Sequence, residues 1–99
     1  MQLELFPKMV EIVPNWSPLV TFCEKYGKLY AFKQYGHDGL IEVSDFMWMH
    51  SWGGIQCYKH KMNRRYLNID SDGKFYRYLP KYNEYDKISK FEALTALFG

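Results

Sequence analysis

Apolar residues recur with helical spacing near residue 20, and the flanking residues mark both ends of the segment. Four of them share the spacing i, i+3, i+4 and i+7 of one helix face: Leu19, Phe22, Cys23 and Tyr26. Ser17 suits the N-cap, Pro18 suits the first helical position, and Gly27 suits the position just after the last turn. These signals predict a helix over residues 18–26.

Further along the chain, alternating side chains and turn residues indicate strands. We expect strands at five segments: residues 28–35, 40–43, 55–61, 65–70 and 74–79. The turn sequences at residues 36–39 and 70–73 predict two hairpins and therefore antiparallel pairing. We expect Ser44 or Asp45 to cap a short helical turn over residues 46–49. Residues 81–85 read as a polar linker.

A second helix is expected at the end of the chain. Its apolar stripe consists of Ile88, Phe91, Leu94, Thr95 and Phe98. The cap is either Asp86 or Ser89, and Glu92 stands three residues after Ser89 as in a capping box. Together the patterns predict an α+β fold: a small antiparallel sheet of about five strands with two helices packed on it. Residues 1–16, interrupted by Pro7 and Pro14, form an extended N-terminal arm, and residues 17–99 form a single domain.

Composition limits the size and class of the protein. The chain has 99 residues, which suits one domain, and 19% of them are aromatic. Aromatic rings serve cores and binding surfaces equally well. The net charge of +2, from 13 basic and 11 acidic residues, is too small to indicate a nucleic-acid partner by itself.

Neither a secretory signal nor an apolar stretch of the roughly 20 residues needed to cross a bilayer is visible, so we expect a cytoplasmic protein with no membrane partner. Its two cysteines, Cys23 and Cys57, are then expected as reduced thiols, with a disulfide between them as the alternative.

Catalytic and metal-binding motifs are not evident in the sequence. His50, Cys57 and His60 lack a fourth ligand for a closed zinc site. Asp70 begins a segment like a calcium loop, but Lys81 stands where the last acidic ligand belongs. We therefore expect no enzyme activity, no metal and no cofactor.

The first five residues after Met1 read Gln-Leu-Glu-Leu-Phe. Leu5 and Phe6 are adjacent apolar anchors on an accessible terminus. This segment resembles the short peptide by which many bacterial replication and repair proteins dock on the DNA polymerase sliding clamp. Gln2, Leu3, Leu5 and Phe6 match its four anchor positions, while Glu4 stands at the variable position, where Ser or Asp is more usual. The resemblance covers five residues and implies an accessory protein that modulates DNA replication or repair; the alternative is an edge strand with Phe6 in the core.

Basic and aromatic residues interleave between residues 58 and 78. Six of them are candidates for binding nucleic acid: Lys59, Lys61, Arg64, Arg65, Tyr76 and Arg77. The alternatives are a solvated hairpin with its rings turned inward, or a surface that binds an acidic protein.

The segment Phe46–Trp52 is unusually rich in Trp and Met for a loop. It forms either part of the core or an exposed protein-binding surface that includes Trp48 and Trp52. In the second case we expect a small phage or mobile-element protein that binds and blocks a host or defence protein.

Overall fold

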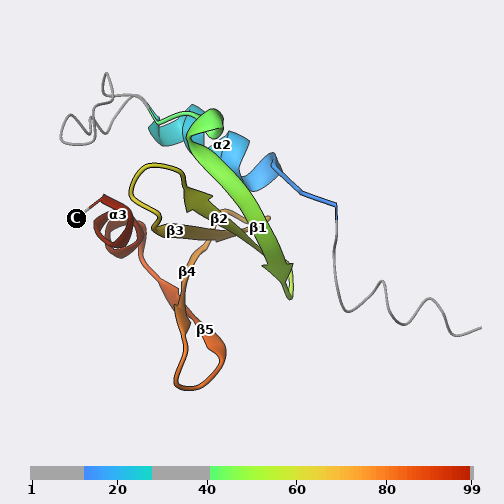
Figure 1. The fold of residues 1–99 in the computed structure, drawn as a ribbon, viewed down its shortest axis with the longest axis vertical. Coiled ribbons are helices and arrows are strands. Elements are labelled where there is room, and N and C mark those ends of the chain that lie inside the picture. Colours follow the sequence, from blue (N-terminus) through green and yellow to red (C-terminus); the bar gives the residue numbers. More distant parts are fainter. Residues whose placement is uncertain (1–12, 28–40, 99) are drawn as a thin grey trace, which may run out of the picture.

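In the computed structural model of this chain, the described residues are 13–27 and 41–98. They form two α-helices and one short 3-10 helix: α2 (Ser17–Tyr26), η2 (Val43–Asp45) and α3 (Lys90–Phe98). They also form five strands: β1 (Phe46–Trp52), β2 (Ile55–His60), β3 (Tyr66–Asp70), β4 (Phe75–Leu79) and β5 (Glu84–Ile88). The strands make one antiparallel sheet in the order β1-β2-β3-β4-β5 (Figure 1). The predicted α+β class is confirmed.

The pairing within the sheet is shortest between β3 and β4. Strands β4 and β5 pair over five residues on each side, whereas β3 and β4 pair only at Asn68 with Tyr76 and at Ile69 with Phe75. The two strands separate beyond the first of these pairs. Figure 1 shows the β4–β5 hairpin extending away from the other three strands.

The core lies on one face of the sheet, where both α-helices pack. Its buried side chains include Leu19 and Phe22 from α2, Leu67 and Ile69 from β3, and Leu94 and Leu97 from α3. Tyr58 is 0% exposed and donates a hydrogen bond of 2.6 Å to the Asn15 carbonyl oxygen, and its ring stacks on Trp16 at 5.7 Å. Residues 15 and 16 are thereby held against the folded body.

No helix within residues 13–27 and 41–98 is long and apolar enough to cross a membrane.

Helix α2 confirms the prediction for residues 18–26, with a different cap. The N-cap position is Trp16, and Ser17 makes no side-chain cap. Asn15 instead accepts the Ser17 N–H through its side-chain oxygen at 3.1 Å. The helix begins at Ser17, one residue earlier than the sequence indicated.

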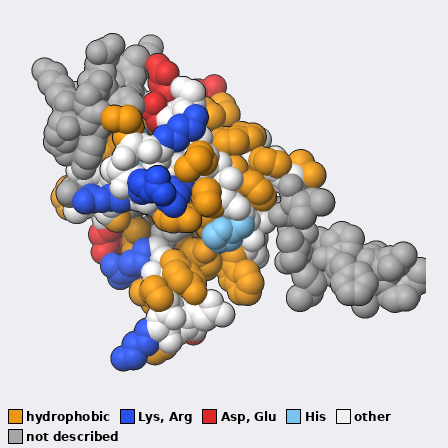
Figure 2. Space-filling model, viewed as in Figure 1, with side chains coloured by type: hydrophobic (Ala, Val, Ile, Leu, Met, Phe, Trp, Pro, Cys, Tyr) orange, Lys and Arg blue, Asp and Glu red, His pale blue; other side chains and the backbone are white. Residues whose placement is uncertain are grey.

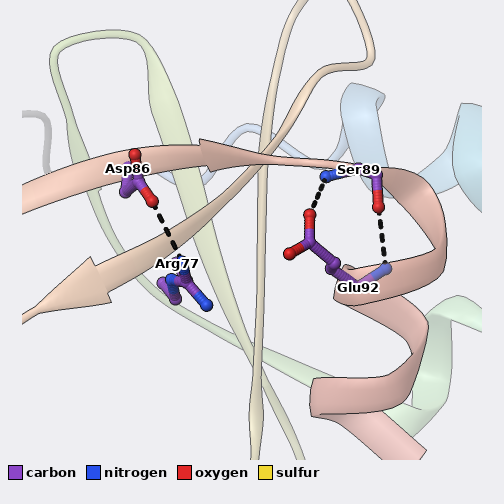
Figure 3. A network of polar contacts seen from close by, with 4 residues as sticks. All are labelled: Arg77, Asp86, Ser89 and Glu92. Atoms are coloured by element: carbon purple, nitrogen blue, oxygen red, sulfur yellow. Dashed lines mark hydrogen bonds and ion pairs between the residues drawn. The ribbon is translucent and has the colours of Figure 1, made fainter.

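Helix α3 has the capping box that its sequence predicts (Figure 3). The Ser89 hydroxyl accepts the Glu92 N–H at 3.0 Å, and the Glu92 carboxylate accepts the Ser89 N–H at 2.9 Å. These two bonds to Ser89 lower the pKa of Glu92. The alternative cap, Asp86, lies within β5. The expected apolar stripe was partly wrong, since Phe91 is 76% exposed while Ala93 and Leu97 face the core.

Three predicted elements were wrong. Residues 46–49 belong to β1 because pairing with β2 keeps them extended, and the helical turn lies just before them at η2, where Glu42 and Asp45 cap reciprocally. Residues 40–43 do not form a strand in their described part, because the Ile41 N–H bonds to the Gly27 carbonyl oxygen and Val43 begins η2. Residues 81–85 do not form a linker. Asn83, at φ 52°, closes a turn, and β5 begins at residue 84.

Two other predictions lie outside the described residues. They are the strand at 28–35 with its turn, and the N-terminal segment at 1–12 that includes Gln2, Leu3, Leu5 and Phe6.

Candidate binding groove between β3 and β4

A groove of about 660 Å³ lies where β3 and β4 separate. The Asn68 side chain stands at this point and donates a hydrogen bond of 3.2 Å to the Tyr76 carbonyl oxygen. If the register continued, Tyr66 would lie opposite Tyr78. The strands diverge instead, and the space beside these two residues forms part of the groove.

Five aromatic side chains line the groove: Trp52, Tyr66, Tyr76, Tyr78 and Tyr85. Trp52, Tyr66 and Tyr78 are exposed, at 54%, 40% and 43% of their surface. The Tyr78 and Tyr85 rings lie 5.1 Å apart in a tilted arrangement. Large exposed rings on neighbouring strands leave apolar surface that the sheet itself does not cover.

Two of these rings are oriented by hydrogen bonds through their hydroxyl groups. The Tyr78 hydroxyl donates to the Asn83 side-chain oxygen at 2.7 Å, and the Tyr76 hydroxyl donates to the Asp70 carboxylate at 2.7 Å. A ring fixed in this way loses little further conformational entropy when it binds a partner.

The groove is positively charged. Arg65 and Arg77 line it, and none of its described lining residues is Asp or Glu. Arg77 contacts Asp86 at 3.1 Å, with both side chains about half exposed, so solvent weakens this pair (Figure 3). Figure 2 shows Lys and Arg side chains beside hydrophobic ones over the middle of the face in view.

A small polar cluster includes two of the lining residues, His50 and Tyr85. The Tyr85 hydroxyl lies 3.3 Å from the Cys57 sulfur and 3.2 Å from His50 Nε2. Burial raises the pKa of Cys57, although its hydrogen bond with Tyr85 opposes that change. Burial also raises the pKa of Tyr85, and Cys57 adds to the effect. A thiol that is 0% exposed and has a raised pKa is a poor nucleophile.

The groove brings together residues that the sequence assigned to two different sites. Arg65, Tyr76 and Arg77, predicted to bind nucleic acid, line it together with Trp52, predicted to bind a protein. Lys59 does not line the groove, but its amine lies over the ring of the lining residue Tyr66, 5.8 Å from the ring centre.

The other predicted site residues lie elsewhere. Lys61 and Arg64 are exposed around the β2–β3 turn and do not line the groove. Trp48 is half-buried and packs against the core, where its indole N–H donates to the Gln56 side-chain oxygen at 2.7 Å.

Three of the aromatic groove residues were not among the named sequence candidates: Tyr66 and Tyr78, which lie within the interleaved segment, and Tyr85. Tyr76 and Tyr78 are two residues apart and so share a face of β4, a signal that could have found Tyr78. Tyr85 was missed because its strand was taken for a linker.

The two cysteines are free thiols, and Cys23 and Cys57 form no disulfide. Across residues 13–27 and 41–98, no group of three or more His, Cys, Asp or Glu side chains is arranged to hold a metal ion. Cys57 and His60 are three residues apart on β2 and therefore lie on opposite faces of the sheet. His60 is packed between the rings of Phe46 and Phe98.

Comparisons with protein-family models, curated proteins and solved structures found no match for this chain.

Proposed function

We propose that this protein works by binding another macromolecule in the β3–β4 groove, and not by catalysis. The observation that carries this proposal is the set of residue types in the lining. Trp, Tyr and Arg supply most of the binding energy at protein interfaces, and here Trp52, Tyr66, Tyr78, Arg65 and Arg77 converge on one hollow.

The state of the cysteines supports a non-catalytic role. Cys57 is covered by Tyr85, and burial raises the pKa of Cys23 to about 12, with Asp45 and Glu42 adding to the effect. Neither thiol is activated as a catalytic cysteine would be.

The test is capture from a bacterial lysate with purified protein, followed by identification of both bound protein and bound nucleic acid. We compare wild type with the double variant Tyr66→Ala, Tyr78→Ala and with the control Phe91→Ala, an exposed ring on α3 outside the groove lining. Circular dichroism checks that each variant is folded. The proposal expects one macromolecule to be retained by wild type and control and lost by the double variant. Equal retention by all three would contradict it.

We propose a second binding element in residues 2–6, on the observation that Gln2, Leu3, Leu5 and Phe6 match the anchors of the clamp-docking peptide. In this role the protein docks on the sliding clamp in the bacterial cytoplasm and modulates replication or repair.

Isothermal titration against purified clamp tests this second element. Leu5→Ala with Phe6→Ala should abolish binding, while the matched control Glu4→Ala, at the variable position, should preserve it. Undiminished binding by the double variant would rule the element out.

The lysate capture also tests the predicted role as an inhibitor. A host or defence protein that wild type retains and the Tyr66→Ala, Tyr78→Ala variant loses would favour that role.

A further inference from the structure

The charge around the groove suits an anionic partner. Between residues 59 and 81 the chain has seven Lys or Arg residues and two Asp residues. One of the two, Asp70, is engaged locally: its carboxylate accepts the Asp72 and Lys74 N–H groups at 2.9 Å each, as well as the Tyr76 hydroxyl. The β2–β4 region is therefore positive. No Asp or Glu is among the described lining residues of the groove, although the Asp86 carboxylate lies 3.1 Å from the lining residue Arg77.

The rings around the groove suit a partner with flat faces. Tyr66 lies on one wall and Tyr78 on the other, because the two strands that bear them have diverged. Both rings are exposed, and Trp52 adds a third exposed ring to the lining. A planar aromatic group can stack on such rings, and the stacking does not depend on which hydrogen-bonding groups its edge carries.

Cationic groups flank these rings at short range. The Lys59 amine lies over Tyr66, and Arg65, the residue before Tyr66, also lines the groove. Alternation of rings and cations along one groove matches a polymer that alternates bases and phosphates. An acidic peptide would use the cations but would leave most of the exposed rings without a flat partner.

We infer that the β3–β4 groove binds single-stranded nucleic acid, with bases stacked on Tyr66 and Tyr78 and a phosphate contacted by Arg65. This inference rests on the proposed function of the groove and names its partner. A duplex is excluded as the partner because its bases are stacked on each other and their faces are not accessible.

The test is fluorescence anisotropy with a labelled oligo(dT) of about 15 nucleotides, within the range of single-strand site sizes, and a duplex of the same length. The single strand should bind at least about tenfold more tightly than the duplex. With about three phosphate contacts, one each from Arg65, Arg77 and the neighbouring Lys59, raising the salt from about 50 to about 200 mM should weaken binding on the order of tenfold.

Matched variants locate the site. Arg65→Gln should reduce the salt slope by about 0.7, and Tyr66→Leu should weaken binding at least about fivefold. The controls Lys25→Gln, on α2, and Phe91→Leu, on α3, make the same kinds of change outside the groove and should leave the affinity unchanged.

Several results would overturn the inference: no binding to the single strand, equal binding to the duplex, or equal loss in the controls. Full competition by polyglutamate, together with an oligonucleotide affinity that Tyr66→Leu leaves unchanged, would identify an acidic protein as the occupant instead. These failures remain distinct from failure of the proposed function. If the Tyr66→Ala, Tyr78→Ala variant still loses its captured macromolecule, the groove is a binding site for another partner.

Discussion

Gly27, directly after α2, is expected to resist substitution by alanine. Its φ of −58° and ψ of −32° lie in the ordinary helical region, so the dihedral angles do not require glycine. At such a site alanine is normally favoured by about 1 kcal/mol. Here an added Cβ would lie 2.7 Å from the Ile41 carbonyl oxygen and still closer to that of Cys23.

Neither oxygen can move freely. The Cys23 oxygen accepts the Gly27 N–H at 2.8 Å, and the Ile41 backbone is held by its own N–H bond to the Gly27 oxygen at 3.1 Å. Overpacking costs about 1–3 kcal/mol, and a weakened hydrogen bond adds about 1 kcal/mol. After the gain in helix propensity, Gly27→Ala should reduce the free energy of unfolding by about 1–3 kcal/mol.

Thermal unfolding followed by circular dichroism measures this loss. For a domain of this size we expect Tm to fall by about 5–20 °C. The control Thr21→Ala, at an exposed position of α2, should change the free energy of unfolding by less than about 0.5 kcal/mol. An unchanged or higher Tm for Gly27→Ala would refute the close approach of residues 27 and 41.

Three further outcomes follow from polar groups and thiols. Ser89→Ala removes the hydroxyl that accepts the Glu92 N–H. It should lower the free energy of unfolding, measured by urea denaturation, by about 1 kcal/mol. Although burial raises the pKa of Asp70, its hydrogen bonds lower it overall. Its stabilising effect is therefore present above the ordinary pKa of about 4 and is lost as the pH falls through the lower folded value, so wild type should lose more stability than Asp70→Asn on acidification. Because the pKa of Cys23 is raised to about 12 and Cys57 is covered, iodoacetamide at about pH 8 should label neither thiol until the protein unfolds.

The elements predicted from the sequence were those with strong local signals. Helix α2 has its apolar spacing, and α3 has its capping box. The β3–β4 turn has Gly73 at φ 83°, a conformation that glycine adopts readily. In each case the structure is decided by residues that are close together in the sequence.

The elements that were missed depend on contacts between distant segments. The Phe46–Trp52 segment becomes a strand through pairing with β2, which outweighs the helical signal of Ser44 and Asp45. Strand β5 was missed because three of its five residues, Glu84, Asp86 and Lys87, are charged. Its Tyr85 contacts Cys57 and His50, which are 28 and 35 residues away in the chain. The groove arises because the β3–β4 register ends after two pairs, and no local pattern encodes that ending.

The three tryptophans allow the most direct test of the groove as the binding site. Only Trp52 lines it, while the Trp48 indole N–H bonds to Gln56 and the Trp16 ring stacks on Tyr58. In a ¹H–¹⁵N NMR titration with oligo(dT), each indole N–H gives its own signal. We predict that the Trp52 signal shifts with added oligonucleotide while those of Trp16 and Trp48 remain in place. A titration that shifts Trp16 or Trp48 and leaves Trp52 unchanged, or shifts none of them, would contradict the assignment.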